Sequence, residues 1–193
     1  MLSSLSQLKP RTTKTQDVDI VVSAEDLGLT AEDIKERIVG ADDRYFLELS
    51  RRRGATHQIL YCRLPGWWTD RRRVKVDILV PPTLGLPEIR SYDVVYIHRI
   101  PVMPLFDLLV MKLQGWWEHR NSSRTDYQAK ESADVDDINA LLDRADTENL
   151  SYDDEIDAYR LHQEFVGNAC LLVRRFVSVY SGNRRWRHLG FPV

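Results

Sequence analysis

The residues best suited to chemistry are three aspartates on two predicted strands. Asp17 and Asp19 belong to a run rich in β-branched residues over 17–22, and Asp77 lies in an alternating strand predicted over 73–80. Residues two apart on a strand project from the same face, so Asp17 and Asp19 should stand side by side. Close carboxylates repel each other unless a cation lies between them, and Mg²⁺ prefers oxygen ligands of this kind. A third carboxylate from a neighbouring strand would complete a two-metal site for phosphoryl-type transfer.

The same three aspartates have a simpler interpretation. Charged residues on a strand commonly mark the solvated face of a sheet. By spacing alone, a metal site and three solvated acids are both compatible with Asp17, Asp19 and Asp77.

The elements that must position these residues change character along the chain, from strands in the first half to helices in the second. Alternating or β-branched runs predict strands at 17–22, 44–49, 57–62, 73–80 and 94–98. Thr30 and Asp33 form a capping-box pattern that predicts a helix ending near Gly40. Helical spacing predicts helices at 104–119, 133–145 and 158–180, the last broken near 167–168, with a polar loop at 121–126 and a basic tail after Gly182.

This order predicts an α+β (α/β-like) fold, in which a mixed β-sheet flanked by helices is followed by a C-terminal helical bundle. We expect an αβ core over 1–102 and a helical region over 103–193 packed on it.

Composition narrows the class of protein. The chain has 193 residues, 43% of them hydrophobic, and a formal net charge of −2, which argues against a wholly basic nucleic-acid-binding surface. Cys62 and Cys170 are the only cysteines, too few for a disulfide framework or a cysteine-ligated zinc site. The sequence has no signal-peptide pattern and no apolar run of about 18 residues, so we expect a cytoplasmic protein without a membrane partner.

Several segments, taken in order, resemble the nucleotidyltransferase superfamily. Residues 11–22 look like the segment that carries its paired aspartates, and 74–80 like the strand with its third aspartate. Leu108–Lys112, with Arg120, Arg124 and Lys130, and then Asp134–Ile138 resemble the distal helices of the branch that includes the AbiEii-type toxins. The resemblance covers about residues 2 to 142.

The resemblance implies a metal-dependent enzyme that transfers a nucleoside monophosphate from a nucleoside triphosphate to a hydroxyl acceptor, in RNA or protein. Asp17 and Asp19 would hold two Mg²⁺ ions, with Mn²⁺ as a substitute, and Asp77 would complete the site and help to deprotonate the acceptor. The nucleotide would contact the residues Ser3, Ser4, Arg11, Lys112, Asp134 and Asp137. Without the resemblance, Lys112 reads as a lysine extending from an amphipathic helix, and Asp134 and Asp137 as charges near a helix N-terminus.

The sequence departs from the family pattern at its start. The usual Gly-Gly or Gly-Ser pair falls on Ser3 and Ser4, and the helix that normally precedes it has no counterpart. Glycine there lets backbone amides approach a phosphate. The chain is therefore either a shortened relative or part of a longer one. The alternative function is a catalytically degenerate protein that serves as a nucleotide-binding or protein-interaction module.

A third hypothesis concerns basic and aromatic runs. Arg71–Arg73 and the segment 184–188 have the charge to bind RNA phosphates, although short runs of this kind are more often solvated. The pairs Trp67–Trp68 and Trp116–Trp117 are compatible with base stacking, but core or interface packing is the more common role of such pairs.

Overall fold

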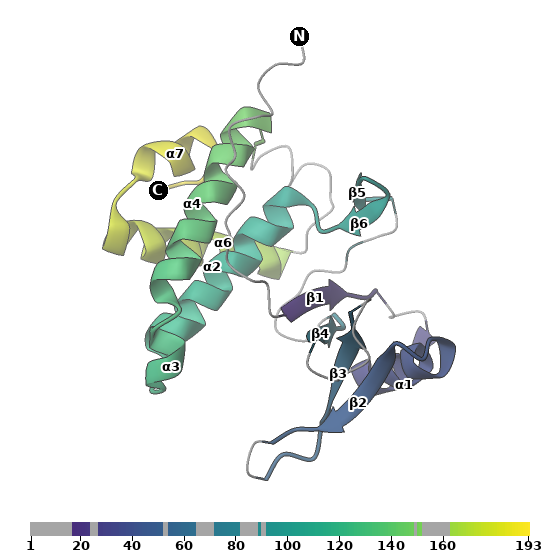
Figure 1. Cartoon of the computed structure of the whole chain (residues 1–193). Helices are drawn as coiled ribbons and strands as arrows, with labels where there is room; N and C mark the ends of the chain where they lie inside the picture. The colour runs from purple at the N-terminus through teal and green to yellow at the C-terminus, as the bar shows by residue number, and fades with distance from the viewer. Residues whose placement is uncertain are drawn as a thin grey trace. The chain divides into compact units, whose positions relative to one another are not determined.

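The computed structural model describes residues 17–23, 27–51, 54–64, 72–81, 89, 92–148, 150–151 and 163–193 (Figure 1). The chain folds into two compact units, 1–80 and 81–193. The first holds a mixed sheet with a helix, and the second is mainly helical, so the predicted α+β class is confirmed. The division into 1–102 and 103–193 stays a prediction.

The sheet of the first unit has the strand order β1-β4-β3-β2. Its strands are β1 (Asp17–Val21), β2 (Tyr45–Leu49), β3 (Gln58–Arg63) and β4 (Arg73–Leu79). β1 pairs with β4 in parallel, whereas β2–β3 and β3–β4 are antiparallel. All four strands lie within one or two residues of their predicted bounds.

One face of this sheet carries the hydrophobic core of the first unit. Leu60, Val76 and Ile78 are buried there against Ile34 of helix α1 (Ala31–Ala41). The alternation of β4 places Val74, Val76 and Ile78 on this face and its three charged residues on the other. The opposite face is therefore the one that carries Asp77.

Helix α1 begins as the capping box predicts. The Asp33 amide donates to Thr30 Oγ1 at 3.2 Å, and the Thr30 amide donates to Asp33 Oδ2 at 2.8 Å. These two bonds satisfy amides that a helix start otherwise leaves unpaired. The helix runs through Gly40 to Ala41, so the predicted stop was slightly early.

In the second unit, the strand predicted at 94–98 is half of a hairpin. β5 (Val95–Ile97) pairs with β6 (Ile100–Val102), and His98 and Arg99 between them have φ values of 50° and 68°. Two positive φ angles are the mark of a two-residue turn that usually contains Asn-Gly. Because His-Arg carries no such signal, the second strand was missed.

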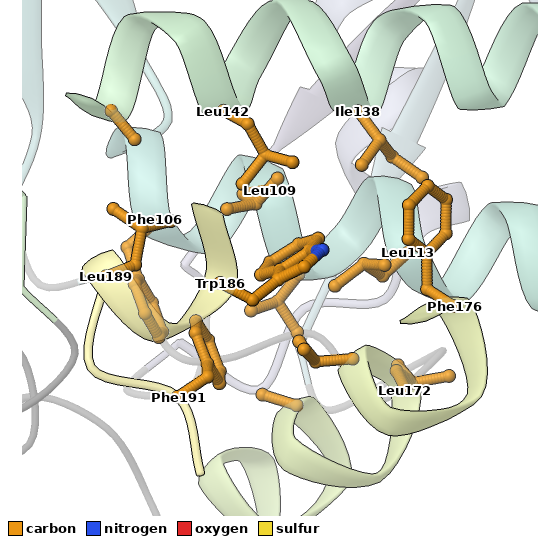
Figure 2. Close-up of a cluster of buried hydrophobic side chains, with 14 of the residues drawn as sticks. Phe106, Leu109, Leu113, Ile138, Leu142, Leu172, Phe176, Trp186, Leu189 and Phe191 are labelled. Carbon is orange, nitrogen blue, oxygen red and sulfur yellow. The ribbon is translucent and has the colours of Figure 1, made fainter. Parts of the chain in front are cut away.

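The helices of the second unit are α2 (Leu105–Asn121), α3 (Thr125–Gln128), α4 (Glu131–Glu148), α6 (Gln163–Tyr180) and α7 (Asn183–His188). Their shared core is drawn in Figure 2, where Trp186 of α7 lies in the middle of the labelled side chains. Trp186 packs edge-on against Phe176 and Phe191, with ring centroids 6.0 and 5.5 Å apart. A six-residue helix is thus held by one large buried ring.

Two predictions about the helical region were wrong. The segment 121–126 is not all loop, because α3 begins at Thr125, and α6 is continuous through Gly167. The basic tail after Gly182, for which no element was predicted, contains α7. A glycine inside a helix costs about 1 kcal/mol relative to alanine. In α6 that cost is outweighed by the burial of a helically spaced row, Phe165, Ala169, Leu172, Val173 and Phe176.

The structure describes one of the two tryptophan pairs. Trp116 is fully buried in the core of the second unit, which confirms its packing role, and Trp117 packs against the same core. Trp67 and Trp68 lie outside the described residues. Within the described part of the chain, no helix combines the length and apolar character needed to cross a membrane.

Trp186→Ala should lower the free energy of unfolding by about 3–5 kcal/mol, because it removes a large ring from a packed core. Urea denaturation followed by circular dichroism measures the change. The matched control is Leu171→Ala, since Leu171 is an exposed residue of α6; a loss at Leu171 equal to that at Trp186 would contradict the central position of Trp186.

Candidate functional site

The three predicted aspartates meet on the sheet face opposite α1. In the parallel register of β1 and β4, Asp19 lies beside Asp77 and Asp17 lies beside Lys75. Neighbouring strands are about 4.8 Å apart, so the side chains of these four residues form one charged cluster. Asp17 and Asp19 are exposed, and 36% of the Asp77 side chain is accessible. The prediction that all three share one sheet face agrees with this register.

Lys75 is the residue of this cluster that sequence reasoning missed. Its ammonium forms an ion pair with Asp77 Oδ2. Burial acts to lower the pKa of Lys75, but the hydrogen bond to Asp77 and the charges of Asp77, Asp17 and Asp19 outweigh it and raise that pKa. Lys75 therefore stays protonated and supplies the cation that the carboxylates need. The available signal was its place two residues before Asp77, on the same face of the strand.

The side chains of the cluster are of the right chemical type to bind a divalent metal, but they are not arranged around a metal position in this structure. Three carboxylates on adjacent strands are the hard oxygen ligands that Mg²⁺ takes. Within the described residues, however, no group of three potential ligands converges closely enough to hold a metal ion. Asp77 is instead paired with the ammonium of Lys75.

The residues of the second unit that were predicted to bind the nucleotide lie on α2 and α4, where the two helices face each other. Lys112 Nζ is 3.1 Å from Asp137 Oδ2, and His119 Nδ1 is 2.6 Å from Asp134 Oδ2. The contacts connect later residues of α2 to earlier residues of α4, so the two helices run antiparallel. The structure thus brings Lys112 and both predicted aspartates onto one helix pair, as an interhelical ladder of charges.

A further step of this ladder joins a third helix. Glu131 of α4 accepts hydrogen bonds from Arg120 of α2 and from the Tyr180 hydroxyl of α6. The Trp116 indole N–H in turn donates to Tyr180 Oη at 3.5 Å. The hydrogen bond from Tyr180, followed by that from Arg120, lowers the pKa of Glu131 against the opposing effect of burial.

Three of the predicted nucleotide-binding residues, Ser3, Ser4 and Arg11, lie outside the described residues. Arg71 of the basic run 71–73 lies outside them as well. The acidic cluster and the α2–α4 ladder belong to different units.

The comparison with solved structures finds a similar fold in another protein. It is an antigenic nucleotidyltransferase-like protein from Paracoccidioides brasiliensis. The structural match covers 92% of this chain and 76% of the Paracoccidioides chain, with a TM-score of 0.54 and 15% sequence identity. The fold is nucleotidyltransferase-like. At this identity the likeness establishes the fold alone. No family model and no curated protein sequence matches the chain.

A nucleotidyltransferase-like fold agrees with the resemblance found in the sequence. It supports the fold that this resemblance implied.

The Glu131 contacts predict a pH-dependent stability. Because the folded state lowers the pKa of Glu131 below its ordinary 4.5, the stabilisation is present above that value and is lost as the pH falls through the folded pKa. At pH 7 Glu131→Gln should lower the free energy of unfolding by about 1–2 kcal/mol. The difference from wild type should shrink at pH 3.

Urea denaturation at pH 3, 5 and 7 measures this effect. Glu118→Gln is the matched control, since Glu118 is an exposed glutamate of α2 that contacts Gln114. A constant difference between wild type and Glu131→Gln at all three pH values would show that the charge of Glu131 is not the stabilising element.

Proposed function

We propose that the protein is a metal-dependent nucleotidyltransferase that moves a nucleoside monophosphate from a nucleoside triphosphate to a hydroxyl acceptor. The supporting observation is the parallel register that gathers Asp17, Asp19 and Asp77 on one sheet face. The nucleotidyltransferase-like fold makes this chemistry the natural candidate for that cluster.

In the proposed reaction, an oxygen of the acceptor attacks the α-phosphorus in line with the bond to the β-phosphate. That bond breaks and pyrophosphate leaves, while the acceptor proton passes to the carboxylate of Asp77. Asp17 and Asp19, with Asp77, would hold two Mg²⁺ ions. When bound, such ions neutralise the charge that develops on the attacking and leaving oxygens.

Lys75 gives this proposal a specific feature. Its ammonium and a divalent cation compete for the same carboxylate oxygens, because Lys75 is paired with Asp77 in the described structure. Metal binding therefore requires Lys75 to move away from Asp77. The displaced ammonium then has a new partner within reach in the phosphates of the nucleotide.

We place the nucleotide contacts of the second unit on the α2–α4 ladder, as in the AbiEii-type branch. Lys112 is the candidate for the phosphates, since 40% of its side chain is accessible and its partner Asp137 is similarly accessible. Asp134 is better suited to orienting His119, because it is nearly buried and 2.6 Å from that ring.

One observation favours the second candidate, a catalytically degenerate nucleotide-binding or interaction module. The Lys75–Asp77 pair gives the acidic cluster an internal cation, so its folding does not depend on a metal. Likewise, the ion pair between Lys112 and Asp137 joins α2 to α4, so Lys112 has a structural role that does not require a nucleotide. The two candidates differ in whether the bound nucleotide is transferred.

Asp77→Asn and Asp17→Asn should each reduce transfer of label from an α-³²P-labelled nucleoside triphosphate by ~100-fold or more, because each removes a charge at the reacting phosphate. The assay uses cell extract as the source of acceptor and Mg²⁺ as the metal. Glu36→Gln, which removes an exposed carboxylate from α1 on the other side of the sheet, is the control. Labelling by Asp77→Asn at the wild-type rate sinks the mechanism, and nucleotide binding without labelling supports the module.

Lys75→Met should tighten the binding of Mg²⁺ or Mn²⁺ by about tenfold, because it removes a competing charge from the carboxylates. Calorimetric titration of the full chain measures the affinity. Lys35→Met is the matched control, since Lys35 pairs with Glu32 on α1. Equal affinities of wild type and Lys75→Met would mean that the metal does not use Asp77.

A further inference from the structure

A second feature lies on the same sheet face as the acidic cluster. Phe46 of β2 and Tyr61 of β3 are paired in the register and stack with ring centroids 5.7 Å apart. The Arg63 guanidinium lies 4.3 Å from the centre of the Phe46 ring, and that of Arg73 lies 4.1 Å from the centre of the Tyr61 ring. We call these four residues the arginine–aromatic layer.

The layer is not part of the hydrophobic core. The cluster of the first unit lies on the other sheet face, and neither Phe46 nor Tyr61 belongs to it. Both rings are half-buried, Arg63 is exposed, and 24% of the Arg73 side chain is accessible. Two aromatic rings with guanidinium groups over them therefore face solvent, which core packing does not explain.

Arginines gather at the adjoining end of the sheet. The Arg63 amide donates to the Arg44 carbonyl at 2.9 Å, Arg63 pairs with Arg73 in the register, and the Leu64 amide donates to the Arg72 carbonyl at 3.0 Å. Four arginines thus come from the neighbouring ends of three strands. Arg44 is paired with Asp42, and Arg73 with Glu48. Phosphate offers the same two-oxygen geometry to a guanidinium as these carboxylates do.

A ligand that uses the whole layer must present both flat rings and negative charge. An acidic peptide or a free phosphate would use the charge alone. A single strand of nucleic acid alternates bases, which stack on aromatic rings and guanidinium planes, with phosphates, which pair with arginine. The chemistry of the layer matches that class of ligand.

The layer also lies close to the acidic cluster. Arg73 is two residues before Lys75 on the same face of β4, a distance of roughly 7 Å along the strand. Lys75 is in turn paired with Asp17. A strand bound on the layer would have its end within reach of the three aspartates.

We propose that the arginine–aromatic layer binds single-stranded nucleic acid and thereby selects a nucleic-acid strand as the acceptor. The acceptor role rests on the proposed nucleotidyl transfer. Binding to the layer does not, because it needs neither nucleotide nor metal.

Fluorescence anisotropy with a labelled single-stranded RNA of about 12 nucleotides tests the binding without nucleotide or metal. Arg63→Gln should weaken binding about tenfold and reduce the salt dependence by about one phosphate contact. Arg63→Lys keeps the charge but loses the flat stacking surface, so it should keep the salt dependence and still bind more weakly than wild type. Tyr61→Leu should weaken binding roughly tenfold through lost base stacking.

Arg37→Gln is the matched control, because Arg37 is an exposed arginine on α1, which packs on the opposite sheet face. Circular dichroism and thermal melting of each variant identify any loss of fold. Absence of RNA binding by wild type, or equal losses in Arg37→Gln and Arg63→Gln, would overturn the proposal.

Asp77→Asn separates this proposal from the proposed function. It should bind the RNA at least as tightly as wild type, since Asp77 lies outside the layer and its replacement removes a negative charge and frees Lys75. If wild type binds RNA through Arg63 but transfers no nucleotide to it, the RNA-binding surface stands and its role in selecting the acceptor falls. If labelling of another acceptor occurs while RNA does not bind, nucleotidyl transfer stands and this inference fails.

Discussion

The parallel register between β1 and β4 is the constraint on which the candidate site depends. It sets Asp19 beside Asp77 and Asp17 beside Lys75. A slip of one residue would turn the charged side chains toward the apolar face, because side chains alternate with a period of two. The burial of Val76 and Ile78 against Ile34 opposes that slip. The packing of the core therefore fixes the chemistry on the other side of the sheet.

This constraint creates an electrostatic problem that Lys75 solves. Three carboxylates held together by a register repel one another, and the register offers them no freedom to separate. Lys75, two residues before Asp77, lies on the same face, and the negative charges of the three aspartates raise its pKa. Its positive charge in turn reduces the repulsion between them. The sheet can thus fold before any ligand binds, because the acidic cluster has a cation of its own.

The sequence was most informative where a local rule decides the structure. The alternation of residues 73–80 predicted both the strand β4 and its faces, and Thr30 with Asp33 predicted the start of α1 from hydrogen bonds between near neighbours. The failures came where tertiary contacts decide. Nothing local in His98–Arg99 marks a tight turn, and only the burial of the α6 row explains why Gly167 does not break that helix.

The candidate site follows the same division. The shared face of Asp17 and Asp19 follows from strand geometry, whereas the neighbour of each aspartate depends on strand order, which one sequence does not reveal. Lys75 lies two residues before Asp77 on the same strand, so its position was readable, but its role became apparent only when β1 placed two more carboxylates beside it. The arginine–aromatic layer was hidden in the same way, because Phe46, Tyr61, Arg63 and Arg73 come from three strands that meet only in the sheet.

The net charge of −2 conceals a separation of charge on one sheet face. Along the polar face of β4, Arg73 and Lys75 are followed by Asp77, so the sign changes within a single strand. Arg73 leans over the ring of Tyr61, away from the aspartates of β1, while Lys75 remains with Asp77. A ligand with anionic phosphates at one end and a metal-bound group at the other would match both ends, whereas a ligand of uniform charge would be repelled by one of them. The polarity of this face thus suits the phosphorylated, metal-associated substrate that we propose for it.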